Sequence, residues 1–312
     1  MKQSVISVSN LTKDFKGIKK NIRAIDDISF DLYKEEFVAF IGLNGAGKTT
    51  TLKCLTGLLT PTSGKVSVLG YDPSKRKHNF LKKIGMVMGN KTQLWWELPA
   101  IETFQLNKEI YDIENGKYNE ILNELFDLLD IREVIQIPVR KLSLGERMKC
   151  ELVASLIHTP ELLFLDEPTL GLDILSAQAL RDFLREYNKR YKATILLTSH
   201  NMQDISDLCK RVIIIDKGRL VYDGKISELT TDFVKTKDIL FTLQESVTQK
   251  EISEIGELVR FTGLTGILSV PRNRVASTSS KLLSRFKVSD LNIQEPSLEY
   301  IVGDIFKGKY RE

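Results

Sequence analysis

The sequence lacks any long hydrophobic run. No window of about 18 uninterrupted apolar residues occurs, which is the length that a membrane-spanning helix requires. The first 30 residues carry scattered charges where a signal peptide would have a basic and then an apolar region. We therefore expect that this chain neither spans a membrane nor is secreted by this route, and that another polypeptide supplies any membrane span.

Cysteine is scarce. The 3 cysteines, Cys54, Cys150 and Cys209, are widely separated and show no CxxC spacing. An odd number without such spacing argues against a disulfide framework and against a zinc site. Each cysteine has apolar neighbours, so we expect buried free thiols in a reducing compartment, which points to the cytoplasm.

An excess of either charge is also missing. The net charge is +4, from 45 basic and 41 acidic residues, so composition does not support nucleic-acid binding. Hydrophobic residues make up 42% of the 312 residues, which is ordinary for a globular chain. We expect the basic stretch at 75–83 to lie on a solvated face. The alternative is a contact with anionic lipid or with a partner.

The order of elements predicts an α/β fold. Short apolar runs predict parallel strands buried on both faces, at residues 37–41, 162–165, 194–198 and 211–216. Shorter strands are predicted near the start of the chain, at 5–9 and 24–32, with a helix at 49–59. Residues 90–160 are mostly helical in pattern; in a helix at 117–130, one face carries Ile121, Leu122, Leu125, Leu128 and Leu129.

After about residue 230 the composition shifts toward Thr, Ser, Lys and Glu. We expect a first domain at 1–230, whose helical subdomain spans about 90–160, and a small α+β domain at 231–312. In the second domain the pattern is strand, helix, strand, helix, with strands predicted at 239–243, 266–270 and 288–293 and a helix at 280–286.

A glycine-rich segment that follows the apolar run at 37–41 fits the phosphate-loop pattern G-x-x-x-x-G-K-[ST]. Between a strand and a helix, its backbone amides and the positive helix end converge on a point where anionic phosphates bind. Lys48 supplies a charge for the β- and γ-phosphates, and the Thr49 hydroxyl is placed to ligate Mg²⁺. The predicted nucleotide-binding residues are Gly42, Leu43, Asn44, Gly45, Ala46, Gly47, Lys48, Thr49 and Thr50.

Paired carboxylates end the next predicted strand. Asp166 fits a Mg²⁺ ligand, and Glu167 is then aimed at the attacking water. The strand at 194–198 ends at the same sheet edge and is followed by His200, which predicts a γ-phosphate sensor. With Lys48, these groups predict in-line hydrolysis of ATP.

At this point the residues resemble the ABC (ATP-binding cassette) ATPases over about residues 4–230. Leu142-Ser143-Leu144-Gly145-Glu146 is similar to their LSGGQ signature, and 166–173 is similar to a Walker B strand followed by a D-loop with Asp173. The resemblance implies a P-loop NTPase core of the ABC type. It also implies that ATP and Mg²⁺ are the cofactors.

The resemblance further implies the partners. In this family the signature of one subunit closes over ATP held by a second, head to tail, so Ser143, Leu144, Gly145 and Glu146 would contact ATP in trans. The second cassette would be an identical chain or a paralogue. Separate membrane-spanning permease subunits would place the protein at the cytoplasmic face of the cell membrane, and no nucleic-acid partner is expected.

The sequence departs from the family at three positions. Leu144 stands where glycine is usual and Glu146 where glutamine is usual, so a carboxylate lies near the expected triphosphate unless Arg147 or Lys149 compensates. Where the family has a glutamine that contacts Mg²⁺ or water, the candidates are Asn90 and Gln93, and we favour Asn90. We expect these departures to affect the rate of ATP hydrolysis more than ATP-gated dimerisation.

Aromatic residues and the tail carry further resemblance. Phe15 resembles the aromatic that stacks on adenine, and a phenylalanine in the core is the alternative. Trp95 and Trp96 lie either in the core or on an exposed surface that receives a helix of the membrane subunit, and we favour the surface. The tail at 295–301 and the segment LWWELP at 94–99 resemble ABC-2-type exporter cassettes, which implies export.

Two other functions compete with the transport ATPase. One is a soluble ABC ATPase that acts on nucleic acid, ribosomes or protein assembly; a single cassette without a heptad run argues against it. The other is a regulatory module that holds ATP without turnover, which Glu167 and His200 argue against. The sequence does not identify the transported substrate, because the residues that contact it lie in other subunits.

Overall fold

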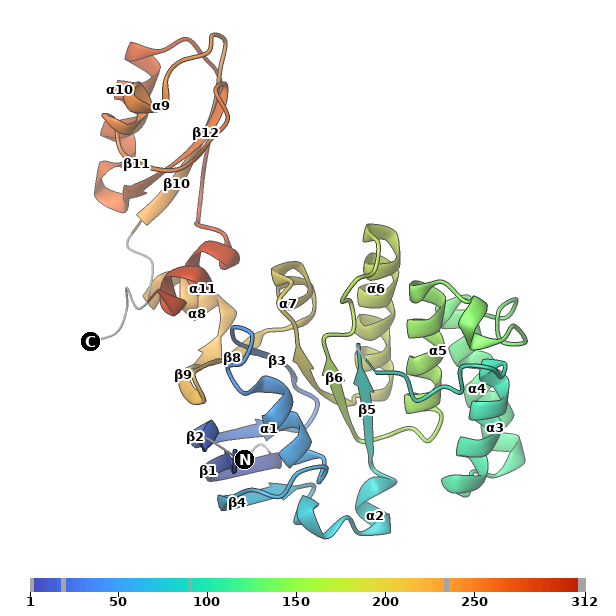
Figure 1. The fold of residues 1–312 in the computed structure, drawn as a ribbon. Coiled ribbons are helices and arrows are strands. Elements are labelled where there is room, and N and C mark those ends of the chain that lie inside the picture. The colour runs from blue at the N-terminus through green and yellow to red at the C-terminus, as the bar shows by residue number, and fades with distance from the viewer. Residues whose placement is uncertain (1–2, 18–20, 90, 233–235, 308–312) are drawn as a thin grey trace. The chain divides into compact units, whose positions relative to one another are not determined.

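The computed structural model describes residues 3–17, 21–89, 91–232 and 236–307. The chain divides into two compact units, 1–224 and 225–312 (Figure 1). Each unit has its own sheet structure and its own hydrophobic core. The fold is that of an α/β P-loop protein with a separate small C-terminal unit.

A six-stranded sheet forms the centre of the first unit, in the order β5-β6-β7-β3-β8-β9. The pairs β5·β6, β6·β7, β7·β3 and β3·β8 are parallel. The strands are β3 (Phe37–Ile41), β5 (Ile84–Met88), β6 (Leu162–Asp166), β7 (Thr194–Thr198), β8 (Arg211–Asp216) and β9 (Arg219–Lys225). The buried apolar runs predicted at 37–41, 194–198 and 211–216 are confirmed, and β6 continues one residue further, to Asp166.

A second, antiparallel sheet in this unit has the order β2-β1-β4, with β1 (Ser4–Phe15), β2 (Ile22–Tyr33) and β4 (Ser63–Val68). β1 and β2 are longer than the predicted strands, because their ends, which include the polar pair Asp14 and Arg23, continue the ladder between the two strands. Helix α1 (Lys48–Leu55) ends before the predicted Leu59. Gly57 has a left-handed backbone, with φ of 73°, which the helix cannot continue through.

Helices surround the parallel sheet. Figure 1 shows α3, α4 and α5 grouped beyond the β5 edge, while α6 and α7 lie along the sheet. The predicted apolar face of α4 is confirmed, since Ile121, Leu122, Leu125 and Leu129 are all buried. The helices are α2 (His78–Leu81), α3 (Ala100–Ile110), α4 (Asn115–Leu129), α5 (Leu144–Leu156), α6 (Ile174–Tyr191) and α7 (Met202–Leu208), with short 3₁₀ turns η1 (Pro73–Lys75) and η2 (Val139–Lys141).

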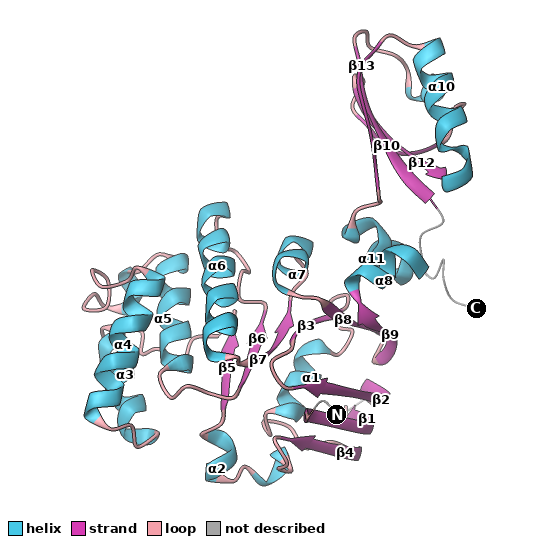
Figure 2. Ribbon diagram, turned by 180° about the vertical axis from the view of Figure 1, so that it is seen from behind, coloured by secondary structure: helices cyan, strands magenta, loops and turns pink. Residues whose placement is uncertain are grey.

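The C-terminal unit contains a four-stranded antiparallel sheet in the order β11-β12-β10-β13, whose β-α-β-β-α-β connection is ferredoxin-like (Figure 2). The strands predicted at 239–243, 266–270 and 288–293 are confirmed as β10, β12 and β13, and the helix predicted at 280–286 lies almost entirely in α10. The predicted order was incomplete because it missed β11 and α9, which are short and only partly buried. The elements are α8 (Ile226–Asp232), β10 (Thr236–Leu243), α9 (Gln249–Ser253), β11 (Glu257–Phe261), β12 (Thr265–Pro271), η3 (Arg272–Arg274), α10 (Val275–Arg285), β13 (Val288–Gln294) and α11 (Leu298–Phe306).

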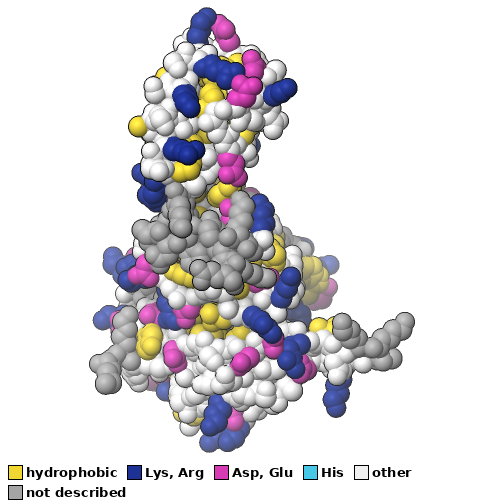
Figure 3. All heavy atoms as spheres, turned by 90° about the vertical axis from the view of Figure 1, so that its left-hand side faces the viewer, with side chains coloured by type: hydrophobic (Ala, Val, Ile, Leu, Met, Phe, Trp, Pro, Cys, Tyr) yellow, Lys and Arg dark blue, Asp and Glu magenta, His cyan; other side chains and the backbone are white. Residues whose placement is uncertain are grey.

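The absences noted in the sequence have structural counterparts. All three cysteines are free and buried, and burial raises the pKa of Cys54 to about 11 and that of Cys150 to about 12. Among the described residues, no helix combines the length and the apolar composition needed to cross a membrane. Basic and acidic side chains are interspersed on the face that Figure 3 presents. In the basic stretch, Lys82 pairs with Asp112 and Lys83 with Glu161.

Candidate functional site

The phosphate loop lies between β3 and α1. Gly47, which caps the helix, has φ of 110°, and a Cβ atom there would come within 2.5 Å of the Ala24 carbonyl oxygen. The Lys48 ammonium is buried and donates a hydrogen bond to the Gly42 carbonyl at 2.7 Å. Its Nζ also lies 3.9 Å from Glu167 Oε1. Loop and carboxylate therefore meet at one end of the parallel sheet.

A pair of hard oxygen ligands lies next to the loop. Thr49 Oγ1 donates to Asp166 Oδ2 at 2.9 Å, and Thr198 Oγ1 donates to Asp166 Oδ1 at 2.6 Å. Asp166 is the last residue of β6 and is buried, so these two hydroxyls orient its carboxylate. A hydroxyl and a carboxylate in contact fit Mg²⁺, which prefers oxygen ligands.

Glu167 and His200 face each other. His200 donates its backbone amide to Glu167 Oε2 at 3.1 Å, and its Nδ1 lies 2.6 Å from the same oxygen. Glu167 has a left-handed backbone, with φ of 56°, which its amide hydrogen bonds to the Thr198 carbonyl and hydroxyl hold in place. The structure thus brings together Lys48, Thr49, Asp166, Glu167 and His200, as the sequence predicted from their positions at strand ends.

A buried charge cluster lies behind His200, and sequence reasoning missed it. Asp204 on α7 is completely buried and accepts from Arg181 Nη1 at 3.0 Å, Ser199 Oγ at 2.8 Å and Thr169 Oγ1 at 2.5 Å. Ser199 precedes His200, and Thr169 follows Glu167 by two residues. The cluster therefore ties together the two segments that carry the catalytic candidates. An aspartate four residues after a histidine gives no signal of this in the sequence.

The signature segment forms the start of α5. Ser143 is the N-cap, and it forms a capping box with Glu146: the Glu146 amide donates to Ser143 Oγ, while the Ser143 amide donates to the Glu146 carboxylate. Gly145 packs against α6, since a Cβ atom there would lie 2.6 Å from Ser176 Oγ. The carboxylate expected to disturb the triphosphate is thus held by its own helix.

The two candidates for the family glutamine differ in the structure. Asn90 lies outside the described residues. Gln93 Nε2 donates to Ser155 Oγ at 2.6 Å and to the Glu151 carbonyl at 3.2 Å, so it is bound to α5. Glu151 itself is buried, which raises its pKa, and its carboxylate accepts hydrogen bonds from the Thr92 hydroxyl and the Gln93 amide. The loop after β5 is therefore attached to the signature helix.

The aromatic candidates are exposed. The exposed fractions of Trp95 and Trp96 are 55% and 48%, so both lie on the surface and the core alternative is wrong. Their contact with a membrane subunit stays a prediction. The Arg147 guanidinium lies 5.5 Å from the Trp96 ring centroid, which connects this surface to α5. Phe15 is 38% exposed, with Lys13 Nζ 5.3 Å from its ring centroid.

Asp173 caps α6, accepting from the Ser176 amide at 2.9 Å and from its hydroxyl at 2.6 Å. These hydrogen bonds lower the pKa of Asp173. The next two residues, Ile174 and Leu175, are 85% and 80% exposed. Two adjacent apolar side chains in water are unusual on a monomer and indicate an interface.

A phosphate loop, an ordered Asp-Glu pair at a parallel-sheet edge and a facing histidine define a P-loop ATPase. The family described as "ABC transporter" matches residues 25–170, and "EvrA-like ABC transporter, C-terminal domain" matches 235–294. The relative NatA of Bacillus subtilis, an ABC transporter ATP-binding protein, is 33% identical over 72% of this chain and 91% of its own. The chain belongs to the ABC transporter ATP-binding proteins and is an ATPase coupled to transport.

Other relatives differ in what their names say they transport. The bacitracin transport ATP-binding protein BcrA of Bacillus licheniformis is 32% identical over 75% of this chain and 72% of its own. The methionine import ATP-binding protein MetN of Geobacillus kaustophilus is 31% identical over 71% of this chain and 66% of its own. The family is thus settled by these likenesses, and the direction of transport is not.

Solved structures show the same fold. A structure of an ATP-binding subunit of an ABC transporter has a TM-score of 0.66 and 27% identity, over 73% of this chain and 93% of its own. The ATP-binding cassette MJ0796, a dimer in a post-hydrolysis state with ADP and Pi, has a TM-score of 0.64 and 22% identity, over 71% of this chain and 98% of its own.

Proposed function

We propose that this ATPase subunit drives export through separate membrane-spanning permease subunits, from the cytoplasmic face of the cell membrane. Residues 1–230 act as the nucleotide-binding domain, with 90–160 as its helical subdomain, and 231–312 act as an accessory domain. The observation that carries the ATPase assignment is the contact set of Lys48, Glu167 and His200. Export is supported by the resemblance of the tail at 295–301 and of the segment 94–99 to exporter cassettes.

In the proposed reaction, the loop 42–50 binds the phosphates of ATP and Phe15 stacks on adenine. Thr49 and Asp166 would hold Mg²⁺, which would neutralise charge on the phosphates, and the resemblance adds Asn90 as a third candidate ligand. Glu167 accepts a proton from the attacking water. His200, whose Nδ1 already binds Glu167, orients that carboxylate and faces the γ-phosphate.

A second cassette completes the site in trans. Its Ser143, Leu144, Gly145 and Glu146 would close over the triphosphate, because the amides at the start of α5 point out of the helix end. The exposed Ile174 and Leu175 beside Asp173 support an interface on this side of the cassette. The second cassette is either an identical chain or a paralogue.

The exposed Trp95 and Trp96 form the proposed contact with the membrane subunit. The loop that carries them is attached to α5 through Glu151 and through Arg147. A push on this loop by the membrane subunit therefore reaches the helix that begins with the signature. In this proposal, the path links ATP closure to the membrane subunit through the contacts between the loop and α5.

Substitution of Glu167 tests the ATPase assignment. Glu167→Gln keeps the size of the side chain and removes the proton acceptor, so turnover should fall by about two orders of magnitude or more, and ATP should trap a dimer visible by light scattering after gel filtration. Equal hydrolysis by both proteins would overturn the assignment.

Transport direction has its own test. The chain is expressed with the membrane proteins encoded beside it and extracted in detergent, where co-purification supports the permease partnership. Inside-out vesicles that contain the complex should accumulate bacitracin, used as a probe, in an ATP-dependent manner. Association only with soluble proteins or with nucleic acid would favour the soluble-ATPase alternative instead.

A further inference from the structure

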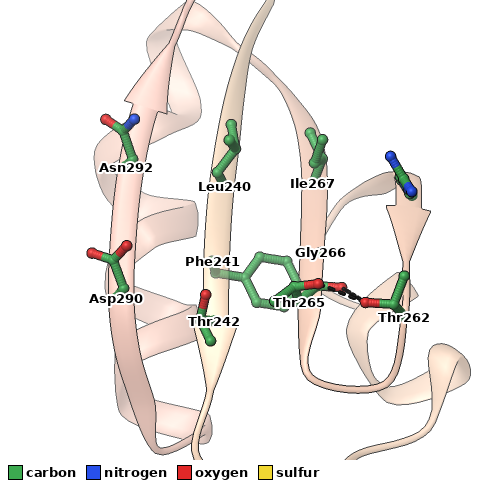
Figure 4. A pocket seen from close by; sticks show the side chains of 10 residues that line it. Leu240, Phe241, Thr242, Thr262, Thr265, Gly266, Ile267, Asp290 and Asn292 are labelled. Carbon is green, nitrogen blue, oxygen red and sulfur yellow. Dashed lines mark hydrogen bonds between the residues drawn. The ribbon is translucent and has the colours of Figure 1, made fainter. Parts of the chain in front are cut away.

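The sheet of the C-terminal unit has one covered face and one open face. Ile239, Phe241 and Leu268 belong to the hydrophobic cluster on the covered face, together with residues of α9 and α10. The side chains that alternate with them line a hollow of about 450 Å³ on the open face (Figure 4). A strand that buries one face only presents the other to solvent or to a partner.

Strand register arranges the residues that line the hollow in two rows. One row runs Arg260, Ile267, Leu240 and Asn292 across β11, β12, β10 and β13. Each row has its apolar or small residues in the two central strands and its polar residues at the edges.

The second row consists of Thr262, Thr265, Thr242 and Asp290. Arg260 and Asp290 thus lie at opposite edges of the sheet, three strand spacings or about 14 Å apart. Neither forms an ion pair within the part of the chain that the structure describes. Arg260 and Asp290 are too far apart to bind one small zwitterion together. Their spacing is compatible with contacts to a second protein surface.

We propose that the open face packs against the same face of a second copy of this chain, about a two-fold axis parallel to the strands. This rotation exchanges β11 with β13 and β12 with β10, so Leu240 meets the partner's Ile267. Arg260 meets the partner's Asn292, and its long side chain reaches the partner's Asp290 one row away. The face is therefore complementary to itself in apolar contact and in charge, as an isologous interface requires.

The other two-fold axis, perpendicular to the strands, gives a poorer match. It exchanges the two rows and leaves each strand opposite its own copy, so Leu240 would meet the partner's Thr242 and Ile267 the partner's Thr265. Apolar side chains would then be placed against polar ones, and Arg260 would lie far from the partner's Asp290. Charge complementarity selects the axis parallel to the strands.

The area of the open face determines under which conditions two copies can pair through it. Four strands of about seven residues cover roughly 450 Å², well below the 800 Å² or so that each partner buries in a stable interface. The contact would therefore form when the cassettes already hold two chains together, which raises the effective concentration of the C-terminal units to the millimolar range, on the order of 1 mM. The inference in this respect rests on the proposed cassette dimer of identical chains.

Charge reversal tests the pairing in the Glu167→Gln background, where ATP should trap the dimer. Arg260→Asp places two carboxylates together at each of the two symmetric contacts, and Asp290→Arg places two cations together there. Each should weaken the ATP-bound dimer about fivefold to tenfold, measured by sedimentation. The double variant Arg260→Asp/Asp290→Arg should restore wild-type affinity, because the charges are exchanged and remain opposite.

Mixing the two single variants gives a sharper readout. A chain with Arg260→Asp and a chain with Asp290→Arg match at both contacts, so differently labelled chains should form heterodimers in preference to either homodimer. Lys281→Asp, at an exposed site of α10 on the covered side of the sheet, is the control and should leave dimerisation unchanged.

The outcomes separate this inference from the proposed function. If the Glu167→Gln protein forms no dimer with ATP, the cassette dimer fails. If it forms one and neither single charge reversal weakens it, or the double variant fails to recover, the sheet-to-sheet pairing is overturned while the ATPase assignment stands.

Discussion

Glu146 accepts two hydrogen bonds from Ser143, one from its backbone amide and one from its hydroxyl, each at 2.8 Å. The serine hydroxyl that the proposed dimer would offer to the partner's ATP is therefore engaged by a carboxylate of its own helix. Closure of the dimer has to redirect that hydroxyl and to bring a negative charge toward the triphosphate. We therefore expect the departure at Glu146 to weaken ATP binding in the proposed dimer.

Glu146→Gln removes this charge and leaves an amide oxygen that can still cap the helix. We expect the ATP concentration for half-maximal ATPase activity to fall about fivefold, because roughly 1 kcal/mol of repulsion is relieved. The capping box of Thr248 and Glu251 in α9 has the same geometry, so Glu251→Gln is a matched control that should not alter the kinetics. A response of the two variants alike, or of neither, would contradict this role.

Thr49 Oγ1 lies 2.9 Å from Asp166 Oδ2, which predicts a dependence of activity on Mg²⁺ through this hydroxyl. Thr49→Ala should raise the Mg²⁺ concentration for half-maximal activity by about tenfold or more. Thr49→Ser keeps the hydroxyl and should stay near wild type. Equal Mg²⁺ requirements of the alanine and serine variants would exclude the hydroxyl as a ligand.

Trp95 and Trp96 predict a loss of partner binding without a loss of ATP binding. Because both side chains are about half exposed, replacing both with alanine should leave the fold intact and weaken co-purification with the membrane subunits by about tenfold or more. Ile22→Ala, at a residue 64% exposed on β2, serves as the control. Intact co-purification of the double variant would place the membrane contact elsewhere.

We expect Asp204, which lies outside the catalytic motifs, to contribute strongly to the free energy of unfolding. Asp204→Ala removes the carboxylate that faces the buried Arg181, which should lower the free energy of unfolding by about 3 kcal/mol in urea titrations. Arg185 pairs with Asp182 on the surface, so Arg185→Ala should cost less than about 1 kcal/mol. Similar losses from both substitutions would argue against the buried cluster.

Asp238 predicts a pH-dependent effect in the C-terminal unit. It is 4% exposed, its Oδ1 has no hydrogen-bond partner in the described part of the chain, and burial with the nearby Glu295 raises its pKa to about 6 from the ordinary 3.8. The folded state thus holds this proton to higher pH than the unfolded state does. Stability from the protonated form is complete below about pH 3.8 and is lost as pH rises through about 6.

Asp238→Asn should therefore slow amide hydrogen exchange in β10 by about tenfold at pH 7.5, in nucleotide-free protein. At pH 4 the two proteins should exchange alike, because wild-type Asp238 is largely protonated there. Asp290→Asn, on the open face of the same sheet, should change neither value. A difference that persists at pH 4 would show that charge on Asp238 is not the cause.

Most of the catalytic candidates could be predicted from the sequence, because each belongs to a short motif. The loop 42–50, the strand ending in Asp166 and Glu167, and the strand before His200 each depend on a few neighbouring residues, and parallel strands bring their carboxyl ends to one edge. The buried strands could also be predicted, because a continuous apolar run of five or six residues is typical of a strand that is buried on both faces. In the C-terminal unit, β11 was missed because none of its five residues is buried, so the segment resembles a solvated loop.

The tertiary structure decided what no local pattern contains. Asp204 reaches Thr169 across 35 positions of sequence, and Gln93 reaches Ser155 across 62, so neither contact has a sequence signal. The sequence by itself determined that this chain binds nucleotide at a phosphate loop, because that chemistry resides in consecutive residues. Only the folded chain decided that Glu146 caps its own helix, that Trp95 and Trp96 are exposed, and that Arg260 and Asp290 lie at opposite edges of one sheet, because exposure and register arise from packing between distant segments.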